Sequence, residues 1–473
     1  MQFITKIILL LLFSQIAIAN SSDFINYNNP IDNISDSEMQ FRLNNLNLCV
    51  QSKYNSTVKS YLKTYTVRDR QKASAILGRI VTYFPMFEKY LEERNMPKDL
   101  KYLAVVESAL IPFATSRSSA KGLWQFMAPT ARQYHLNINS LVDERLDPNK
   151  ATQSALEYLS VLHKKFGNWD LALAAYNGGP GRVRKAIRKG KSHNYWKIKK
   201  YLPKETRNYV SAFIAASYLV NYYYYHDLQP NYPDMDMQVI ESIKVYHEMT
   251  FTQVSSITGV PIYTLQALNP SYKQNKIPRS YVGNYLIIPK RAIDILSKYV
   301  NNPDCEYLLS HVILYDDMFQ GYNPMNFFTR SEYTVQSGDD INKLATLFDC
   351  NIYNIRAWNN LPTNQISIGQ KLIIFQPVAS KSTTAIVASV SVSIPQKAVK
   401  KVVIDKYKDI HLKLKILDEL YDSKFEYYTM KNSDSIRDVL RKYPNTSLKE
   451  LMKDNDFKLF DLPNPGDRLK IRK

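Results

Sequence analysis

Between about residues 71 and 225, apolar residues recur every three to four positions, a spacing that predicts amphipathic helices. The clearest stretch carries Ala73, Ile76, Leu77, Ile80 and Phe84. A second follows the helix-start signal Asp147-Pro148 and carries Ala151, Ala155, Leu156, Leu159 and Leu162. Residues 210–225 form a further apolar run that is rich in tyrosine. The pattern therefore predicts an all-α domain over residues 71–227.

One carboxylate lies on an apolar stripe of these helices. Pro97 opens a helix in which Leu100, Leu103, Ala104 and Glu107 occupy positions i, i+3, i+4 and i+7. Loss of hydration there penalises the charged form and raises the pKa of the carboxyl group, which suits a general acid. The alternative is a glutamate at a helix end that pairs with a nearby Lys or Arg, and helical position alone favours this alternative.

Beyond the helical domain, one pattern recurs three times in imperfect copies. In residues 333–375 an alternating strand leads into a Ser337-Gly338-Asp339 turn, two short helices and a second strand preceded by Gly369-Gln370. Residues 425–473 repeat this pattern with Ser433 in place of the turn glycine, and residues 243–289 form a weaker copy without the turn. Each copy predicts a small βααβ module. Residues 376–424, rich at first in Ser, Ala, Thr and Val, are predicted to be a linker.

The first nineteen residues have the layout of a secretory signal peptide. Lys6 precedes an apolar run at 7–13, and small residues at 17–19 offer a cleavage site before Asn20. The run is too short for a stable membrane span, although a retained N-terminal anchor is the alternative. Residues 20–70 are expected to be a lead-in, mostly irregular up to about Tyr54. We therefore expect an exported protein of the periplasm or cell envelope, with no transmembrane segment after signal cleavage.

Charge and cysteine usage narrow the choice of partners. The 473-residue chain has a formal net charge of +19, and ten Lys or Arg but no acid lie between Asp170 and Glu205. Nucleic acid is the usual partner of such a run, but an exported protein rarely meets it. Anionic wall polymers or a solvated helix face are the preferred explanations, and no nucleic acid is expected. Three scattered cysteines exclude a disulfide scaffold and a cysteine-based zinc site, so we expect no metal and no cofactor.

Three sequence motifs that follow Glu107 distinguish it from an ordinary glutamate at a helix end. The glutamate is followed by Gly122-Leu123-Trp124-Gln125, then by Tyr176-Asn177-Gly178, and then by a Glu-Thr-Arg-Asn-Tyr-Val stretch at 205–210. In this order they resemble the lysozyme-like, single-glutamate lytic transglycosylases, which cut the glycan strands of bacterial peptidoglycan. The resemblance favours a general acid over a helix-end ion pair at Glu107 and implies that Glu107 is the catalytic residue.

The same resemblance implies roles for six further residues. Ser116 and Gln125 match positions that hydrogen-bond substrate, and Met127 matches a position that lines the same subsite. Tyr176 and Asn177 match the loop that closes the groove beneath the muramic sugar, and Tyr209 matches a tyrosine that reaches back towards the glutamate. The sequence departs from the family at Ser119, where a glycine usually precedes Ala120, and at Gly179, where an alanine usually follows Asn177-Gly178.

The reaction implied by this family needs one carboxylate. No Asp or Glu occurs from Ser108 to Val142, whereas ordinary glycosidases use a pair of acids. Asp143, Glu144, Asp147 and Glu205 remain candidates for a second acid that folds back. In the family, the glutamate protonates the oxygen between N-acetylmuramic acid and N-acetylglucosamine. It then takes the proton of the muramic C6 hydroxyl, which closes on C1 to give a 1,6-anhydro ring.

The repeated βααβ module resembles the LysM domain, which binds glycans that contain N-acetylglucosamine. The chain is thus expected to be multidomain, with an all-α lysozyme-like catalytic domain followed by small α+β LysM modules. Its expected partners are peptidoglycan glycan strands, with other cell-wall enzymes as further candidates. Two other functions stay open: a hydrolytic muramidase or chitinase on the same scaffold, favoured by a second carboxylate across the groove, and an inactive wall-binding protein.

Overall fold

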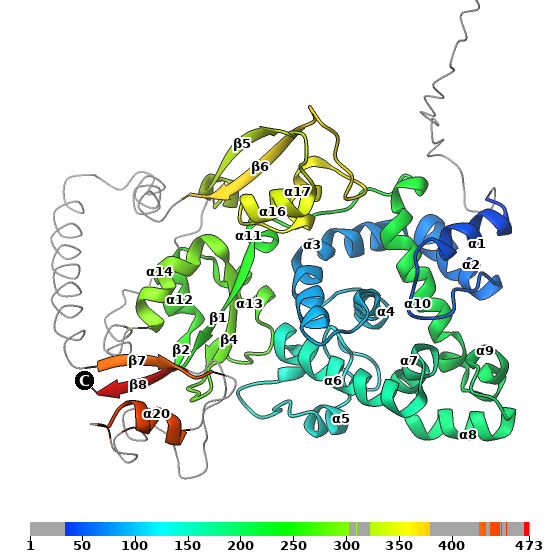
Figure 1. The fold of residues 1–473 in the computed structure, drawn as a ribbon, viewed down its shortest axis with the longest axis horizontal. Coiled ribbons are helices and arrows are strands. Elements are labelled where there is room, and N and C mark those ends of the chain that lie inside the picture. The colour runs from blue at the N-terminus through cyan, green and yellow to red at the C-terminus, as the bar shows by residue number, and fades with distance from the viewer. Residues whose placement is uncertain are drawn as a thin grey trace, which may run out of the picture.

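The computed structural model describes residues 34–301, 309 and 322–378, and in the C-terminal part residues 425–431, 436–444, 446, 451 and 468–472. A helical body comes first and is followed by modules that each contain a two-stranded sheet (Figure 1). This arrangement confirms the predicted fold class. The predicted signal peptide and most of the predicted linker lie outside the described residues.

The helical body is built from eleven α-helices within the described residues. They are α1 (Asp36–Asn44), α2 (Ser56–Lys63), α3 (Arg70–Glu93), α4 (Tyr102–Ser108), α5 (Ala128–Gln133), α6 (Pro148–Phe166), α7 (Trp169–Gly178), α8 (Pro180–Gly190), α9 (Tyr195–Ile198), α10 (Lys204–Tyr222) and α11 (Met235–Gln238). The apolar stripes predicted from the sequence face one shared core: Ile76 and Phe84 of α3, and Leu156 and Leu159 of α6, are almost completely buried.

The stretch before α3 is more ordered than the sequence pattern predicted. Residues 36–44 form α1, and its Met39 and Leu43 are fully buried in the main core. The Arg42 guanidinium donates to the Tyr218 hydroxyl of α10 at 3.1 Å. Two buried side chains on a short polar helix give little periodic signal, and the long-range contact to α10 fixes the segment.

Three modules follow the body. The first comprises β1 (Ile240–Val245), β2 (Met249–Thr250), α12 (Phe251–Thr258), α13 (Ile262–Leu268), β3 (Lys276–Ile277), β4 (Asn284–Pro289) and α14 (Ile293–Val300). The second comprises β5 (Phe328–Thr334), α16 (Ile341–Leu347), α17 (Ile352–Asn359) and β6 (Lys371–Pro377). In the third, β7 (Phe425–Thr429), α20 (Ile436–Lys442) and β8 (Arg468–Arg472) are described. The outer strands pair antiparallel: β1 with β4, β5 with β6, and β7 with β8.

One asparagine shows that the first two modules share the same internal frame. Asn269, after α13, donates to Ile287 O at 2.7 Å and accepts from Ile287 N at 2.7 Å. Asn359, at the end of α17, makes the same two bonds to Ile373, at 2.8 and 2.6 Å. The weak copy therefore keeps the helix-to-strand clamp of the clear copy, although its turn sequence differs. Ser433 of the third copy lies outside the described residues.

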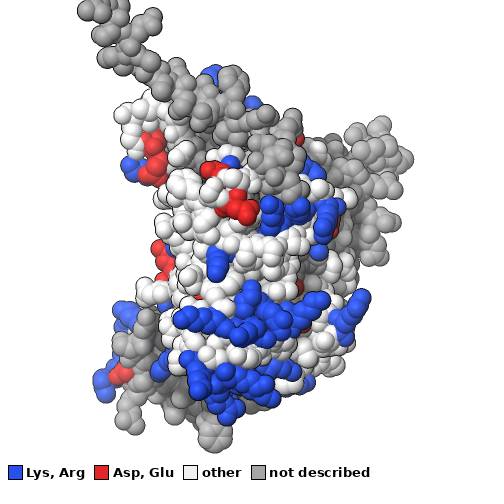
Figure 2. Space-filling view, turned by 90° about the vertical axis from the view of Figure 1, so that its right-hand side faces the viewer, with Lys and Arg blue, Asp and Glu red and all other residues white. Residues whose placement is uncertain are grey.

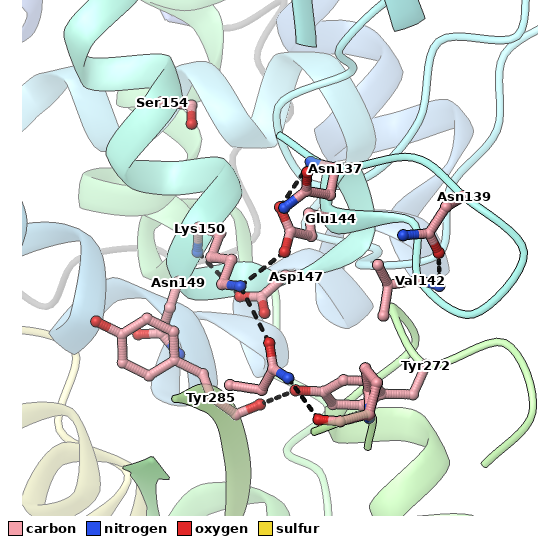
Figure 3. A network of polar contacts seen from close by, with 12 residues as sticks. Asn137, Asn139, Val142, Glu144, Asp147, Asn149, Lys150, Ser154, Tyr272 and Tyr285 are labelled. Carbon is pink, nitrogen blue, oxygen red and sulfur yellow. Dashed lines mark hydrogen bonds and ion pairs between the residues drawn. The ribbon is translucent and has the colours of Figure 1, made fainter. Parts of the chain in front are cut away.

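The first module is docked on the helical body through a polar junction (Figure 3). Lys150 Nζ, at the start of α6, donates to Glu144 Oε1 at 2.7 Å and to Asn284 Oδ1 of β4 at 3.3 Å. Backbone bonds add to this contact: Asp143 N donates to Ser271 O at 2.9 Å. The segment between α13 and β4 therefore packs against the 137–143 loop of the body.

The second module rests on α3. The Tyr353 side chain of α17 belongs to the main core, and its ring meets Phe84 edge-on at 5.9 Å between centroids. Its hydroxyl donates to Glu88 Oε1 at 2.5 Å, and Lys101 pairs with the same carboxylate. Because these groups come from three separate segments, the packing joins this module to the body. Within the described residues, no helix combines the length and apolar character needed to cross a bilayer.

Candidate active site

Glu107 is the penultimate residue of α4. Leu103 and Ala104 on the same helix are fully buried, whereas the Glu107 side chain is only partly covered, as its place at the edge of the apolar stripe requires. Ala109 and Leu110 follow with φ of +53° and +60°, so two left-handed residues end the helix at once. The chain turns away after Ser108, and the Glu107 carboxyl group therefore lies at the end of the helix.

The environment of Glu107 holds its proton near neutral pH. Burial raises the pKa of the Glu107 carboxyl from 4.5 to about 7; the hydrogen bond from Tyr209 opposes this shift, and the negative charge of Glu205 adds to it. A carboxyl group with such a pKa can donate a proton at pH 7 and take one back in the next step.

Two tyrosines from different helices flank the carboxyl group. The Tyr209 hydroxyl, from α10, donates a hydrogen bond directly to Glu107 Oε1. Tyr176, at the end of α7, donates to Trp124 O at 2.8 Å. Burial first, and then the charge of Glu107, raise the pKa of both phenols well above 10. Both tyrosines therefore stay protonated and uncharged at neutral pH.

Asn177 ties the α7 end to the start of α10. Its Oδ1 accepts from Thr206 Oγ1 at 2.8 Å, and its Nδ2 donates to Glu205 Oε1 at 3.3 Å. Glu205 is exposed, and its position one turn before Tyr209 on the same helix explains how its charge is felt at Glu107. Of the four acids that the sequence left open, Glu205 is the one that the fold brings to this site.

The other three acids have structural partners. Burial alone would raise the pKa of Asp143, but its bonds to Arg145, at 2.9 and 2.8 Å, and the charges of Arg145 and Lys121 lower it. Glu144 pairs with Lys150, and Asp147 caps the start of α6 by accepting from Lys150 N at 2.9 Å. Their positions follow from these contacts, and none of these bonds involves Glu107.

The loop from Phe113 to Met127 forms another part of the site. Trp124 is fully buried and donates to Thr152 Oγ1 at 2.9 Å, and Ser108 Oγ, next to the glutamate, donates to Leu123 O at 3.0 Å. Gly122 has φ of +83°, and a Cβ there would lie 1.8 Å from Arg145 O. Gly122 therefore allows the loop backbone to lie close to Arg145, while the bonds of Leu123 and Trp124 hold the loop against α4 and α6.

The remaining predicted residues lie on this loop. Gln125, with φ of +48°, donates its amide to Gly122 O at 2.8 Å and Ala114 O at 3.3 Å. Ser116 Oγ accepts from Ala120 N at 3.0 Å, and Met127 is 42% exposed just before α5. In the described part of the chain no hydrogen bond joins these three residues to Glu107. Ser116 and Gln125 hold the loop through these bonds, and the roles of all three residues toward substrate remain predictions.

The sequence analysis missed Arg145 as a positioning residue. This buried guanidinium donates to Ser119 O at 3.0 Å and Phe126 O at 3.4 Å, so it holds the two ends of the tight loop around Gly122. Its only sequence signal is that it follows two acids in Asp143-Glu144-Arg145, which does not reveal contacts made 26 and 19 residues upstream. Among the described residues, no three His, Cys, Asp or Glu side chains gather as a metal site would require.

Comparison with known families defines the class of protein. Residues 84–199 match the family described as a transglycosylase SLT domain. Residues 239–303 match the LysM-like domain of lytic transglycosylase MltD, and residues 333–375 and 428–472 match the LysM domain. The helical body thus contains an SLT-type transglycosylase domain and is followed by LysM modules, which confirms the family recognised from the motifs.

Two curated relatives and one solved structure are similar to parts of this chain. The chain is similar to membrane-bound lytic murein transglycosylase D of Escherichia coli K12, with 29% identity over 321 residues, 67% of this chain and 66% of the relative. The matched part therefore spans just under two thirds of that relative's length. Soluble lytic murein transglycosylase of Escherichia coli K12 is 33% identical over 110 residues, 22% of this chain and 17% of its own. A solved Pseudomonas aeruginosa structure, an inactive mutant of lytic transglycosylase Slt, matches 28% of this chain and 23% of its own at 27% identity, with a TM-score of 0.25.

Proposed function

We propose that this protein is a peptidoglycan lytic transglycosylase. It cleaves the β-1,4 bond between N-acetylmuramic acid and N-acetylglucosamine and leaves 1,6-anhydromuramic ends. The observation that carries the proposal is the pairing of Glu107, whose pKa is raised to about 7, with a tyrosine that donates to it, in a domain of the SLT family. This pairing supplies a group that can act as acid and base in turn.

In the first step the protonated Glu107 carboxyl gives its proton to the glycosidic oxygen. The bond from that oxygen to the muramic C1 breaks, and the N-acetylglucosamine side leaves as an alcohol. Glu107 is now a carboxylate, and the hydrogen bond from Tyr209 favours this charged form. Tyr209 thus stabilises the state that exists only after proton transfer, which is where stabilisation accelerates the reaction.

In the second step the Glu107 carboxylate takes the proton of the muramic C6 hydroxyl. The C6 oxygen forms a bond to C1, which closes the 1,6-anhydro ring and restores the protonated acid. No water enters the product, and one carboxylate serves both steps. The use of a single carboxylate is supported by the other nearby acids of the sequence, because Asp143, Glu144 and Asp147 are engaged in ion pairing and helix capping.

The modules and the compartment complete the proposal. The LysM modules hold the enzyme on glycan strands, which raises the local concentration of cleavable bonds. The N-terminal signal directs the protein to the periplasm or cell envelope, where it contributes to murein turnover. Neither a cofactor nor nucleic acid takes part.

Digestion of purified sacculi in ¹⁸O-labelled water tests the chemistry. We expect muramic ends that carry the anhydro ring and no label, identified by mass spectrometry. Hydrolysis would place ¹⁸O at the muramic C1. The exposed Glu205, whose charge reaches Glu107, is the second carboxylate that such a result would implicate. A Glu107→Gln variant that retains near-normal cleavage would contradict the assignment of the acid.

A further inference from the structure

Positive charge gathers on one side of the helical body. Figure 2 views the side where α8 and α9 lie in Figure 1 and shows Lys and Arg side chains massed there, with few acids among them. We define the basic face as the exposed cations of this segment: Arg182, Arg184, Lys185, Arg188, Lys189, Lys191, Lys197, Lys200 and Lys204. In the described part of the chain, none of them forms an ion pair with an acid.

This charge distribution is unfavourable for the isolated helix. Arg184 and Arg188, and likewise Lys185 and Lys189, stand at positions i and i+4 of α8, where like charges repel and destabilise a helix. An ordinary solvated helix carries acids at some of these positions, and α8 has none. Arrangements that weaken the fold in this way are typical of surfaces that receive a ligand of opposite charge.

The basic face begins at the candidate active site. Pro180, the first residue of α8, comes three positions after Asn177, and Arg182 Nη1 donates to Gly178 O at 2.9 Å. On the other side of Asn177, Lys204 precedes Glu205 at the start of α10. A polymer bound beside Tyr176 and Asn177 would therefore have the first cations of the face at the groove wall.

We propose that the basic face binds the free carboxylates of peptidoglycan stem peptides, and that it makes the enzyme prefer glycan strands that carry these peptides. This inference rests on the proposed function, because the stem peptide is attached to the muramic sugar whose bond is cleaved. The peptide leaves the groove from the sugar next to Asn177, and its carboxylates are then held close to the face by the same polymer that the groove binds.

A membrane surface is the main competing partner, and the side chains on this face argue against it. Interfacial helices present large apolar residues next to their cations. On α8 the apolar Val183 and Ala186 are buried against the body. Between α8 and α10, Tyr201 is the one large hydrophobic residue with substantial exposure, at 42%. The basic face therefore offers positive charge but no group of exposed apolar side chains that could insert into a bilayer.

The test compares two substrates and two variants of the full-length protein. One substrate is soluble glycan strands with stem peptides, and the other is the same strands after an amidase has removed the peptides. The test variant is Arg184→Gln/Lys185→Gln/Arg188→Gln, since glutamine keeps helix propensity. The matched control removes three exposed cations elsewhere: Arg68→Gln/Lys72→Gln/Lys298→Gln.

On strands with peptides, the test variant should raise KM roughly tenfold, a change of about 1.4 kcal/mol, and leave kcat unchanged. Its KM on peptide-free strands, and both values of the control variant, should stay within about twofold of the wild type. Added salt should raise the wild-type KM more on strands with peptides than on peptide-free strands, which keep only the lactyl carboxylate of each muramic sugar, because exposed charges are screened. Equal effects on both substrates, or none, would overturn the inference.

Binding measurements separate this inference from the proposed function. The same three α8 substitutions are placed in a Glu107→Gln background, and dissociation constants are measured for both kinds of strand. A wild type that releases no anhydro product would refute the proposed activity, while a binding difference confined to strands with peptides would still support the basic face. If the substitutions abolish sedimentation with vesicles that contain phosphatidylglycerol but leave peptide dependence unchanged, the partner is a membrane and the inference is wrong.

Discussion

Replacing Glu107 with Gln should stabilise the folded protein at pH 8 and leave its stability almost unchanged at pH 4. The Glu107 pKa is about 7 in the folded protein, where burial disfavours the charge, and close to its ordinary value of 4.5 in the unfolded chain. Between these two values the folded state holds a proton that the unfolded state has lost. The free energy of unfolding therefore falls as pH rises through this window. Glutamine has no proton to lose, so the variant escapes this loss.

The size of the effect follows from the same two pKa values. Each pKa unit corresponds to about 1.4 kcal/mol, so the wild type loses at most about 3 kcal/mol between pH 4.5 and 7. Partial exposure of the side chain makes this an upper bound. For a body of this size, a gain of 3 kcal/mol raises the melting temperature by roughly 6 to 12 °C. Tyr209 can still donate to the amide oxygen of the variant, so its hydrogen bond is retained.

Denaturant unfolding at pH 4, 6 and 8 provides the assay, with wild type and variant measured side by side. Asp143→Asn is the control of opposite sign. Burial disfavours the Asp143 charge, but the bonds and charges of Arg145 and Lys121 lower the pKa, so the carboxylate stabilises the fold at high pH. We expect Asp143→Asn to destabilise at pH 8 and Glu107→Gln to stabilise there. A Glu107→Gln effect that does not change with pH would refute the reasoning.

Three further predictions concern the loop, the tyrosine and the docked module. Tyr209→Phe removes the bond that holds the Glu107 pKa down, so the alkaline limb of the pH–rate profile should move to higher pH and kcat should fall roughly 10- to 100-fold; a limb that moves to lower pH would contradict this role. Ser119 has φ of +64°, so Ser119→Gly should raise the free energy of unfolding by up to about 1 kcal/mol, and a loss in denaturant titration would show that the serine makes a compensating contact. A chain ended after Asp227 loses the partners of Lys150 and Asp143 in the first module, and it should melt below a chain ended after Asn301; equal melting temperatures would show that the docking contributes nothing.

Local patterns in the sequence were sufficient for the features that depend on neighbours along the chain. The stripe of Leu103, Ala104 and Glu107 follows from helical spacing, and the structure places all three as that spacing requires. The βααβ modules follow in the same way from alternating strands and short helices, even where the turn glycine is missing. Periodicity did not identify Tyr209 as the partner of Glu107; that expectation came from the resemblance to a family.

Tertiary structure decided what depends on residues far apart in the chain. Glu205 and Asp143 are both acids within reach of the motifs in sequence, yet only Glu205 affects Glu107, because α10 brings it there while Arg145 holds Asp143 in an ion pair. The docking of the first module on the 137–143 loop could not be predicted from the sequence either, because it depends on backbone hydrogen bonds such as that from Asp143 N to Ser271 O. The sequence by itself determined the main helices of the body, the repeated modules and the place of the Glu107 carboxyl group beside the apolar stripe of α4. Only the packing of separate helices determined which charges surround that group, because electrostatic effects depend on distance in space.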